Sequence, residues 1–269
     1  MAAAQEVSID AAEIAGTVLK IWWPLLRVGG FVLAAPLIGS SIVPASARIA
    51  FSLALAFTLA PLAQVPAALS IFSGDGALAS VNQVLIGLAI GMTVQLVFDA
   101  LALAGQTVSM TMGLGYATLV DPQRGANTAV LGQMFTILGT LVYLSVDGHL
   151  VLLGSLARSF QTLPIGATPL DRDFFGAVAG WGARVFESGL LIALPATVAL
   201  IIVNLALGVV TRAAPQLNLF GIGFPITMLA GFFALIVGMD SLMTGMGHLI
   251  DEALGMASDL VSTAAPHVH

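Results

Sequence analysis

Few side chains in this sequence are able to do chemistry, and none stands in a pattern typical of a catalytic site. Cysteine is absent from the 269 residues, which excludes disulfides, thiolate metal ligands and a thiol nucleophile. The sequence contains no Gly-x-Ser-x-Gly turn, no His-Glu-x-x-His zinc motif and no phosphate-binding P-loop. A protease acting in the membrane would need paired aspartates, but Asp99, Asp147 and Asp240 stand in no recognisable motif. We therefore expect no enzymatic activity, no cofactor and no metal site.

The composition points to a membrane protein. Lys and Arg number 8, Asp and Glu number 14, and the formal net charge is -6. Charged residues make up 8% of the chain and hydrophobic residues 58%, whereas soluble domains carry about 25% charged residues. This excludes an ordinary soluble enzyme, because so few charges cannot cover its surface, and also a disordered chain. Eight scattered cations form no basic surface, so we expect no nucleic-acid partner.

The spacing of the charges predicts helices that cross a membrane. Seven uncharged stretches of 20 to 27 residues separate successive charged residues, and a spanning helix needs about 20 apolar residues. We predict an all-α polytopic membrane protein of about six long helices arranged in hairpins, kinked near Pro195 and Pro225. The expected helices cover residues 12–35, 47–70, 78–113, 127–160, 174–211 and 219–258.

One of these helices, 78–113, carries a polar stripe. Gln95, Asp99 and Gln106 fall within about 40° of one another at 100° per residue. Such a face does not point at lipid, so it forms either a hydrogen-bonded seam with another helix or the lining of a pore. Earlier in the same helix, Gly87-Leu-Ala-Ile-Gly91 is a pattern typical of close helix contacts.

The stretch from Met110 to Pro122 is apolar, yet two closely spaced glycines, Gly113 and Gly115, disfavour a regular helix there. Non-helical backbone at membrane depth is tolerated only inside protein or beside a cavity. Methionine is flexible enough to fill an irregular gap and to repack when the gap changes. Two interpretations stay open, a simple turn with core methionines and a flexible seal over a passage.

Two further sets of polar residues suggest a different function. Asp147-Gly148-His149 interrupts helix 127–160, and Arg184 and Glu187 are spaced to form an ion pair on one helical face. Together with Asp99, these residues would suit a stand-alone secondary transporter that binds a small solute or a proton. The chain shows no internal repeat of the kind such transporters often have.

Short motifs along the chain occur in a characteristic order. They include Ala35-Pro36, Phe98-Asp99-Ala100, Met112-Gly113-Leu114-Gly115, Asp121-Pro122-Gln123, Ala214-Pro215-Gln216-Leu217-Asn218 and Gly223-Phe224-Pro225. In this order they resemble the FliR family, components of the flagellar type III export gate with relatives in injectisomes. The match runs from about Arg27 to Gly238. One departure is Gln83, where we expect glutamate in the family.

The resemblance implies a non-enzymatic subunit of a protein export gate in the bacterial inner membrane, at the flagellar basal body. Its partners would be FliP-like and FliQ-like subunits, with FlhB-like and FlhA-like proteins nearby and membrane lipid around them. Unfolded flagellar proteins would pass through the assembly. Residues 1–169 would form a FliP-like part of four helices, and residues 170–269 a FliQ-like hairpin with a short tail.

The resemblance also assigns roles to residues. A plug-like loop would close the channel with Met110, Thr111, Met112, Gly113, Leu114, Gly115, Tyr116 and Leu119. The motif around Ala214 suggests a loop for partner contact or assembly, with Arg212, Pro215, Gln216 and Asn218. A static nucleus for assembly, with no moving part, is the remaining alternative.

Overall fold

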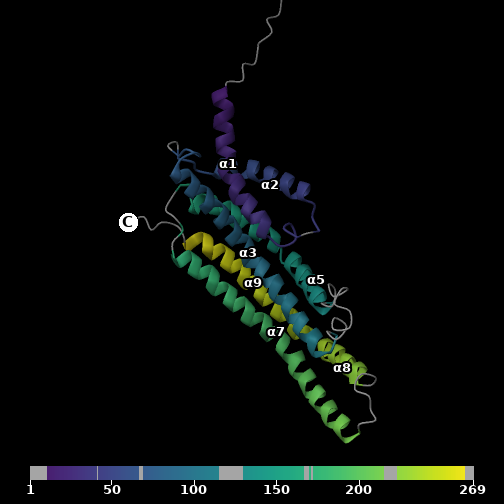
Figure 1. The fold of residues 1–269 in the computed structure, drawn as a ribbon. Coiled ribbons are helices and arrows are strands. Elements are labelled where there is room, and N and C mark those ends of the chain that lie inside the picture. The colour runs from purple at the N-terminus through teal and green to yellow at the C-terminus, as the bar shows by residue number, and fades with distance from the viewer. Residues whose placement is uncertain are drawn as a thin grey trace, which may run out of the picture. The chain divides into compact units, whose positions relative to one another are not determined.

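The computed structural model describes residues 11–40, 42–66, 69–114, 130–166, 170, 172–214 and 223–263. Every regular element in these ranges is a helix (Figure 1). The elements are α1 (Ala11–Ala34), α2 (Ala45–Leu59), the 3-10 turn η1 (Ala60–Leu62), α3 (Gly74–Thr111), α5 (Val130–Ser145), α6 (Gly148–Thr162), α7 (Arg172–Ala213), α8 (Phe224–Val237) and α9 (Met239–Thr263).

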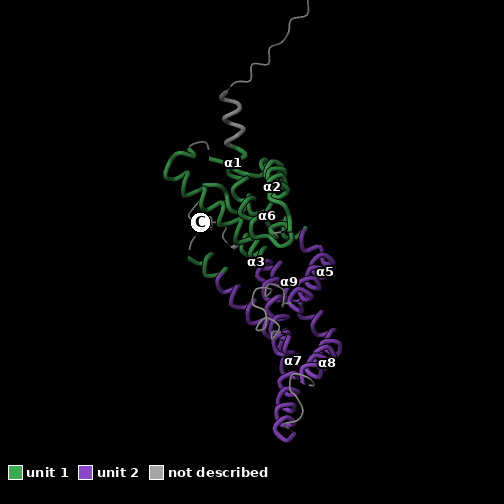
Figure 2. The backbone as a smooth tube through the Cα atoms, turned by 45° about the vertical axis from the view of Figure 1, so that its right-hand side comes forward, with its two compact units in different colours: residues 1–92, 150–178, 257–269 green, residues 93–149, 179–256 purple. Residues whose placement is uncertain are grey.

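The chain forms two compact units, coloured separately in Figure 2. Unit 1 comprises residues 1–92, 150–178 and 257–269, and unit 2 comprises residues 93–149 and 179–256. Each unit draws on both halves of the sequence. The division near residue 169, into a FliP-like part and a FliQ-like hairpin, concerns likeness to other subunits and stays a prediction.

Glycines let α1 and α3 approach closely in unit 1. A Cβ added at Gly87 would collide with the carbonyl oxygen of Arg27, and one at Gly91 would lie 2.8 Å from the carbonyl oxygen of Phe31. The close helix contact predicted from the Gly87–Gly91 pattern is therefore confirmed. Trp23 and Ile165 are buried in a hydrophobic cluster beside this contact.

Unit 2 is organised around the second half of α3. The indole Nε1 of Trp181 on α7 donates a hydrogen bond of 2.9 Å to the carbonyl oxygen of Thr93. Eight residues after Trp181 on α7, a Cβ added at Gly189 would lie 2.8 Å from the Cβ of Ala100, so α7 is close to α3 there too. On another side, a Cβ at Gly105 would collide with the backbone of α5 at Leu131.

The predicted interruption at Asp147-Gly148-His149 is confirmed. Helix α5 ends at Ser145 and α6 begins at Gly148, and the backbone at Asp147 has φ 53°, in the left-handed region that residues with a Cβ rarely adopt. The ring of Tyr143 fills the space beside Gly148, and a Cβ there would lie 2.4 Å from ring carbons. Tyr143 itself stacks edge-on against Phe98, with ring centroids 5.8 Å apart.

Three expectations about helices are wrong. The helix expected at 219–258 is two helices, α8 and α9, whose axes differ by 63°. Gly238 ends α8 at that break, while Pro225 stands in the first turn of α8, where its missing N–H costs nothing, and therefore causes no kink. The helix expected at 47–70 ends at Leu59 because Pro61 fixes the following 3-10 turn.

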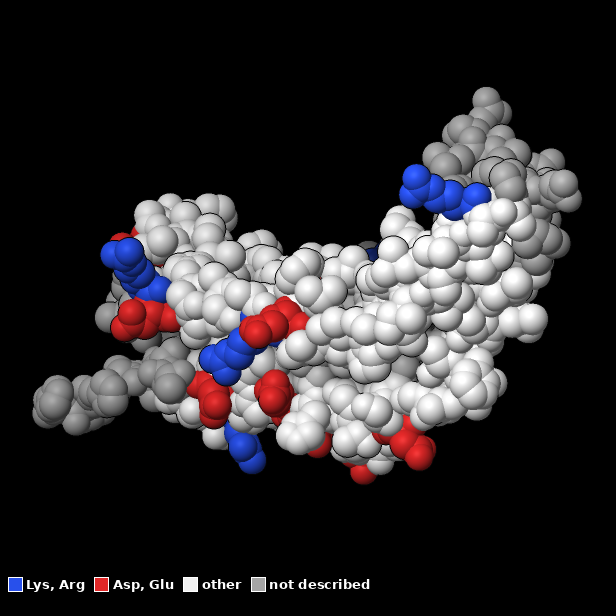
Figure 3. Space-filling view, turned by 90° about the horizontal axis from the view of Figure 1, so that it is seen from below, with Lys and Arg blue, Asp and Glu red and all other residues white. Residues whose placement is uncertain are grey.

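The structure agrees with a polytopic membrane protein. Three helical segments in the described residues are long and apolar enough to span a membrane, and five if each bent pair is one span. Along α7 and α8 large apolar side chains are exposed, among them Val209 at 70% and Phe233 at 69%. Figure 3 shows a face on which uncharged atoms predominate and charged side chains gather in a few places. Lipid or partner subunits must cover such surfaces.

Candidate functional site

The predicted polar stripe lies on one face of α3 in unit 2. The side-chain amide of Gln95 donates a hydrogen bond of 2.9 Å to Oδ1 of Asp99, one turn later. Gln106 follows Asp99 by seven residues and Met110 follows it by eleven, so both return to nearly the same face of the helix. We call Gln95, Asp99, Gln106 and Met110 the α3 strip.

Two members of the α3 strip, Asp99 and Met110, are left uncovered by the described helices that pack on the other faces of α3, while Gln95 and Gln106 are half-buried. The contacts at Thr93 and Ala100 belong to α7, and the contact at Gly105 belongs to α5. Asp99 is exposed, and so is Met110, at 62%. The side-chain hydrogen bond between Gln95 and Asp99 runs within α3, so it does not form a seam with another of the described helices.

Gln106 carries a buried polar atom that lacks a partner. Its Oε1 is shielded from solvent and accepts no hydrogen bond within the described residues. A buried amide oxygen without a donor costs free energy, about 1–3 kcal/mol. The strip therefore combines an exposed carboxylate at Asp99 with a buried amide oxygen at Gln106 that has no donor among the described residues.

The predicted break after Thr111 is a glycine-capped helix end. Gly113 has φ 83°, its N–H donates to the carbonyl of Met110 at 3.0 Å, and the N–H of Leu114 donates to the carbonyl of Ser109 at 3.1 Å. These two bonds together form a Schellman motif, for which glycine is the preferred residue. The sequence reasoning placed the end of α3 correctly.

Met112 is packed inside unit 2. Its side chain is fully buried, and a Cβ added at Gly231 on α8 would lie 2.5 Å from its Cγ and 2.7 Å from its Sδ. The hydroxyl of Thr227, also on α8, lies 3.1 Å from the carbonyl oxygen of Met112 and 3.0 Å from that of Phe224, so its single proton is shared. Met112 thus agrees with the interpretation of a core methionine at a turn.

A second anchor holds the end of α3 from the other side. The amide Nδ2 of Asn204 on α7 donates a hydrogen bond of 3.0 Å to the carbonyl oxygen of Thr111. Sequence reasoning missed both Asn204 and Thr227. Asn204 could have been found from the sequence. It is the one amide in the uncharged stretch between Glu187 and Arg212, and such a residue indicates a hydrogen bond inside the protein.

Some of the predicted site residues lie outside the described part of the chain. These are Gly115, Tyr116 and Leu119 of the plug-like loop, and Pro215, Gln216 and Asn218 of the partner loop. Arg212 is described and is exposed in the last turn of α7.

The charged residues of the transporter interpretation do not form a cluster. Arg184 and Glu187 are both exposed, and the structure contains no ion pair between them, so the predicted pairing is wrong. They are free to extend into their surroundings, where a solvated pair gains little. Asp147 is exposed at the helix break. Among the described residues no three His, Asp or Glu side chains are grouped to hold a metal ion.

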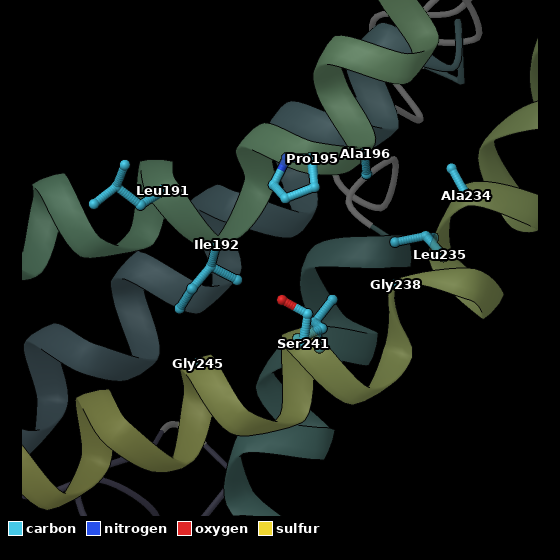
Figure 4. A pocket seen from close by; sticks show the side chains of 10 residues that line it. Leu191, Ile192, Pro195, Ala196, Ala234, Leu235, Gly238, Ser241 and Gly245 are labelled. Carbon is cyan, nitrogen blue, oxygen red and sulfur yellow. The ribbon is translucent and has the colours of Figure 1, made fainter.

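Unit 2 also contains a pocket of about 240 Å³ between α7 and the α8–α9 break (Figure 4). Pro195 on α7 and Gly238 at the break both line it, and Ser241 contributes a hydroxyl to walls that are otherwise apolar. Because proline has no N–H, the carbonyl of Leu191 lacks its helical donor beside this pocket. The pocket therefore lies where both neighbouring helices depart from regular hydrogen bonding.

Known proteins resemble this chain over most of its length. Residues 18–253 match the family model described as "Bacterial export proteins, family 1". The flagellar biosynthetic protein FliR of Escherichia coli (strain K12) is 37% identical over 242 residues, covering 90% of this chain and 92% of the relative. FliR of Pectobacterium carotovorum subsp. carotovorum is 33% identical over 95% of this chain and 98% of the relative. FliR of Bacillus subtilis (strain 168) is 33% identical over 80% and 83%.

The match covers α3, the α3 strip and the Asn204 and Thr227 anchors. It also agrees with the resemblance drawn from the motifs between Ala35 and Pro225. The chain therefore belongs to bacterial export proteins, family 1, the family of the flagellar biosynthetic proteins FliR.

Proposed function

We propose that this chain is a non-enzymatic subunit of the flagellar type III protein export gate and forms part of the wall and the closing plug of its pore. FliP-like and FliQ-like subunits complete the wall, FlhB-like and FlhA-like proteins lie nearby, and unfolded flagellar proteins pass through. In this assembly, residues 1–169 form a FliP-like part and residues 170–269 form a FliQ-like part. The assembly resides in the bacterial inner membrane at the flagellar basal body.

The observation that carries the proposal is the exposed Asp99 on the α3 strip. A carboxylate and two amides follow one face of an apolar helix, and the described helices of unit 2 leave Asp99 open. Intramembrane carboxylates face a bundle interior or a water-filled cavity. Because the described helices supply no cover for Asp99, a shared passage with other subunits gives the carboxylate its water.

The exposed apolar side chains of α7 and α8 support the need for partners. Of the 18-residue apolar window in α7, 17% is buried inside this chain. Neighbouring subunits account for the remaining exposed surface of α7 and α8 better than an isolated chain does.

The plug begins where the structure anchors α3. Asn204 and Thr227 fix the carbonyls of Thr111 and Met112, and the cap at Gly113 turns the chain out of the helix. Met110 is exposed on the α3 strip just before that turn. We assign the closing element to Met110 and to residues 114–119, with Met112 as its fixed base.

A static role in assembly is the second candidate, and the buried Met112 favours it. A methionine packed against Gly231 is part of a core and need not move. The two functions differ in whether the loop after Gly113 controls flow through the assembled complex.

Deleting residues 115–120 tests the proposal. The deletion keeps Met112 in its contact with Gly231 and keeps the cap that Leu114 completes, so unit 2 retains its anchors. We expect the assembled complex with FliP-like and FliQ-like subunits, reconstituted in vesicles, to leak small ions more than tenfold faster than the unaltered complex. A deletion complex that assembles and leaks no more than the unaltered one contradicts the plug.

A further inference from the structure

A groove of about 470 Å³ runs between α1 and α2 in unit 1. Its α1 wall consists of four residues on one helical face, and its α2 wall of five residues that recur every three or four positions. The lining residues are Leu25, Gly29, Val32 and Leu33 on α1, and Ala45, Arg48, Ile49, Ser52 and Leu53 on α2.

Gly29 creates room in the α1 wall. A Cβ added there meets no atom within 4 Å, whereas one at the adjacent Gly30 would collide with the backbone of α3 at Val84. The two glycines therefore have different effects. Gly30 allows close helix packing, and Gly29 leaves the groove open.

Arg48 is the only charged residue that lines the groove. Its Nε is buried and has no hydrogen-bond partner within the described residues. The other polar lining residue, Ser52, donates its hydroxyl proton to the carbonyl oxygen of Arg48 at 2.8 Å. The groove thus offers an aliphatic channel with one guanidinium that lacks an anion.

The position of Arg48 fits the edge of a membrane. Residues Ala45–Leu62 form a candidate span, and Arg48 in its first turn is the only charged residue in it. Arginines near the end of a spanning helix lie at the level of the lipid headgroups. The N-terminus of α2 also has no side-chain cap and no acidic residue in its first turn, so nothing there repels an anion.

We propose that this groove binds one acyl chain of an anionic phospholipid and that Arg48 holds the phosphate. A phospholipid suits the groove because it joins an aliphatic chain to one anionic group, and the lining is aliphatic apart from Arg48 and Ser52. The guanidinium is suited to phosphate, which accepts two parallel hydrogen bonds from it. The inference requires α2 to lie in a membrane but does not depend on the gate.

Native mass spectrometry of the assembled complex, titrated with phosphatidylglycerol or phosphatidylcholine in mixed micelles, tests the proposal. We expect phosphatidylglycerol to bind at least about five-fold more tightly than phosphatidylcholine, and inorganic phosphate alone not to bind measurably. Arg48→Gln should weaken phosphatidylglycerol binding about five-fold, and Arg48→Lys should restore most of it.

Gly29→Leu fills the groove and should abolish acyl-chain binding without disturbing the fold, because its Cβ meets open space. Gly154→Leu is the matched control, since Gly154 is an exposed helical glycine of the same unit with no atom within 4 Å of an added Cβ. The proposal is overturned if Gly29→Leu binds phosphatidylglycerol as the control does. It is also overturned if the lipid binds the isolated chain but not the assembled complex, which would assign the groove to a partner protein.

Discussion

Arg27 on α1 donates a hydrogen bond of 2.8 Å from its Nε to Oε1 of Gln83 on α3, across 56 residues of sequence. The guanidinium is fully buried and also donates to the carbonyl oxygens of Ser159 and Leu163 and to the hydroxyl of Ser159. It lies 4.4 Å from the centre of the Phe160 ring. One side chain therefore joins α1, α3 and the end of α6 in unit 1, through neutral acceptors alone.

The neutral partner of Arg27 leads to a first prediction. Gln83→Leu leaves the Nε of Arg27 buried without an acceptor, which should lower the free energy of unfolding by about 1–3 kcal/mol. Gln83→Glu keeps an acceptor at the same place and adds a charge-assisted bond, so that variant should be at least as stable as the unaltered chain. Thermal unfolding of the purified complex in detergent measures both.

Gln95→Leu is the control for this comparison, because Gln95 is on the same helix but its partner Asp99 is exposed. Gln95→Leu should lower the free energy of unfolding by less than Gln83→Leu does. Equal stability of Gln83→Leu and the unaltered chain would show that Arg27 does not depend on the amide.

The contact between Met112 and Gly231 leads to a second prediction. Gly231→Ala forces the Met112 side chain to move, since the new Cβ would lie 2.5 Å from its Cγ. We expect a loss of about 1–3 kcal/mol, as for other overpacked cores. Met112→Ala makes room for the new methyl group, so the double variant should lose less than the sum of the two single variants. Additive losses in unfolding measurements would contradict direct packing between these positions.

The sequence predicted the helices well where polar or glycine residues mark a helix end. The break at Asp147-Gly148 and the end of α3 at Gly113 were both expected, because glycine there is accompanied by a polar residue or by a second glycine. The break at Gly238 was missed because a single glycine in an apolar run looks like any helical glycine.

The candidate site also contains some residues that the sequence predicts and others that it does not. Periodicity placed Gln95, Asp99 and Gln106 on one face, and the structure agrees. Met110 lies on the same face of the helix, but in the sequence it also begins the apolar stretch that contains the break. The anchors Asn204 and Thr227 depend on contacts across 93 and 115 residues of sequence, which no local pattern contains.

The break between α5 and α6 gives a third prediction, with opposite signs at neighbouring positions. Gly148→Ala pushes a methyl group into the ring of Tyr143 and should destabilise the protein by about 1–3 kcal/mol. Asp147→Gly removes a residue with a Cβ from φ 53° and should stabilise it or leave it unchanged. Unfolding midpoints compare the two. The same sign for both changes would mean that the break does not depend on local geometry.

The carboxylate of the α3 strip gives a fourth prediction, which requires the gate. In the complex that lacks residues 115–120, Asp99→Asn removes a negative charge from the passage and keeps the shape of the side chain. The preference of the leak for cations over anions should fall about two- to five-fold, because charged side chains along a pore select its ions. Glu187→Gln, which neutralises an exposed carboxylate on α7, should leave the preference unchanged. An unaltered preference after Asp99→Asn would remove Asp99 from the passage.

A cysteine pair tests whether Met112 is the fixed base of the plug. The chain has no cysteine, so Met112→Cys combined with Gly231→Cys introduces the only two thiols, at positions in direct contact. Because we place Met112 at the fixed base of the plug, joining it to α8 under oxidising conditions should leave flagellar export and swimming speed within about two-fold of the reduced protein. Each single-cysteine variant serves as a control for loss of packing. Export that stops on oxidation and resumes on reduction would show that Met112 must leave Gly231 during transport, and the moving element would then include the end of α3.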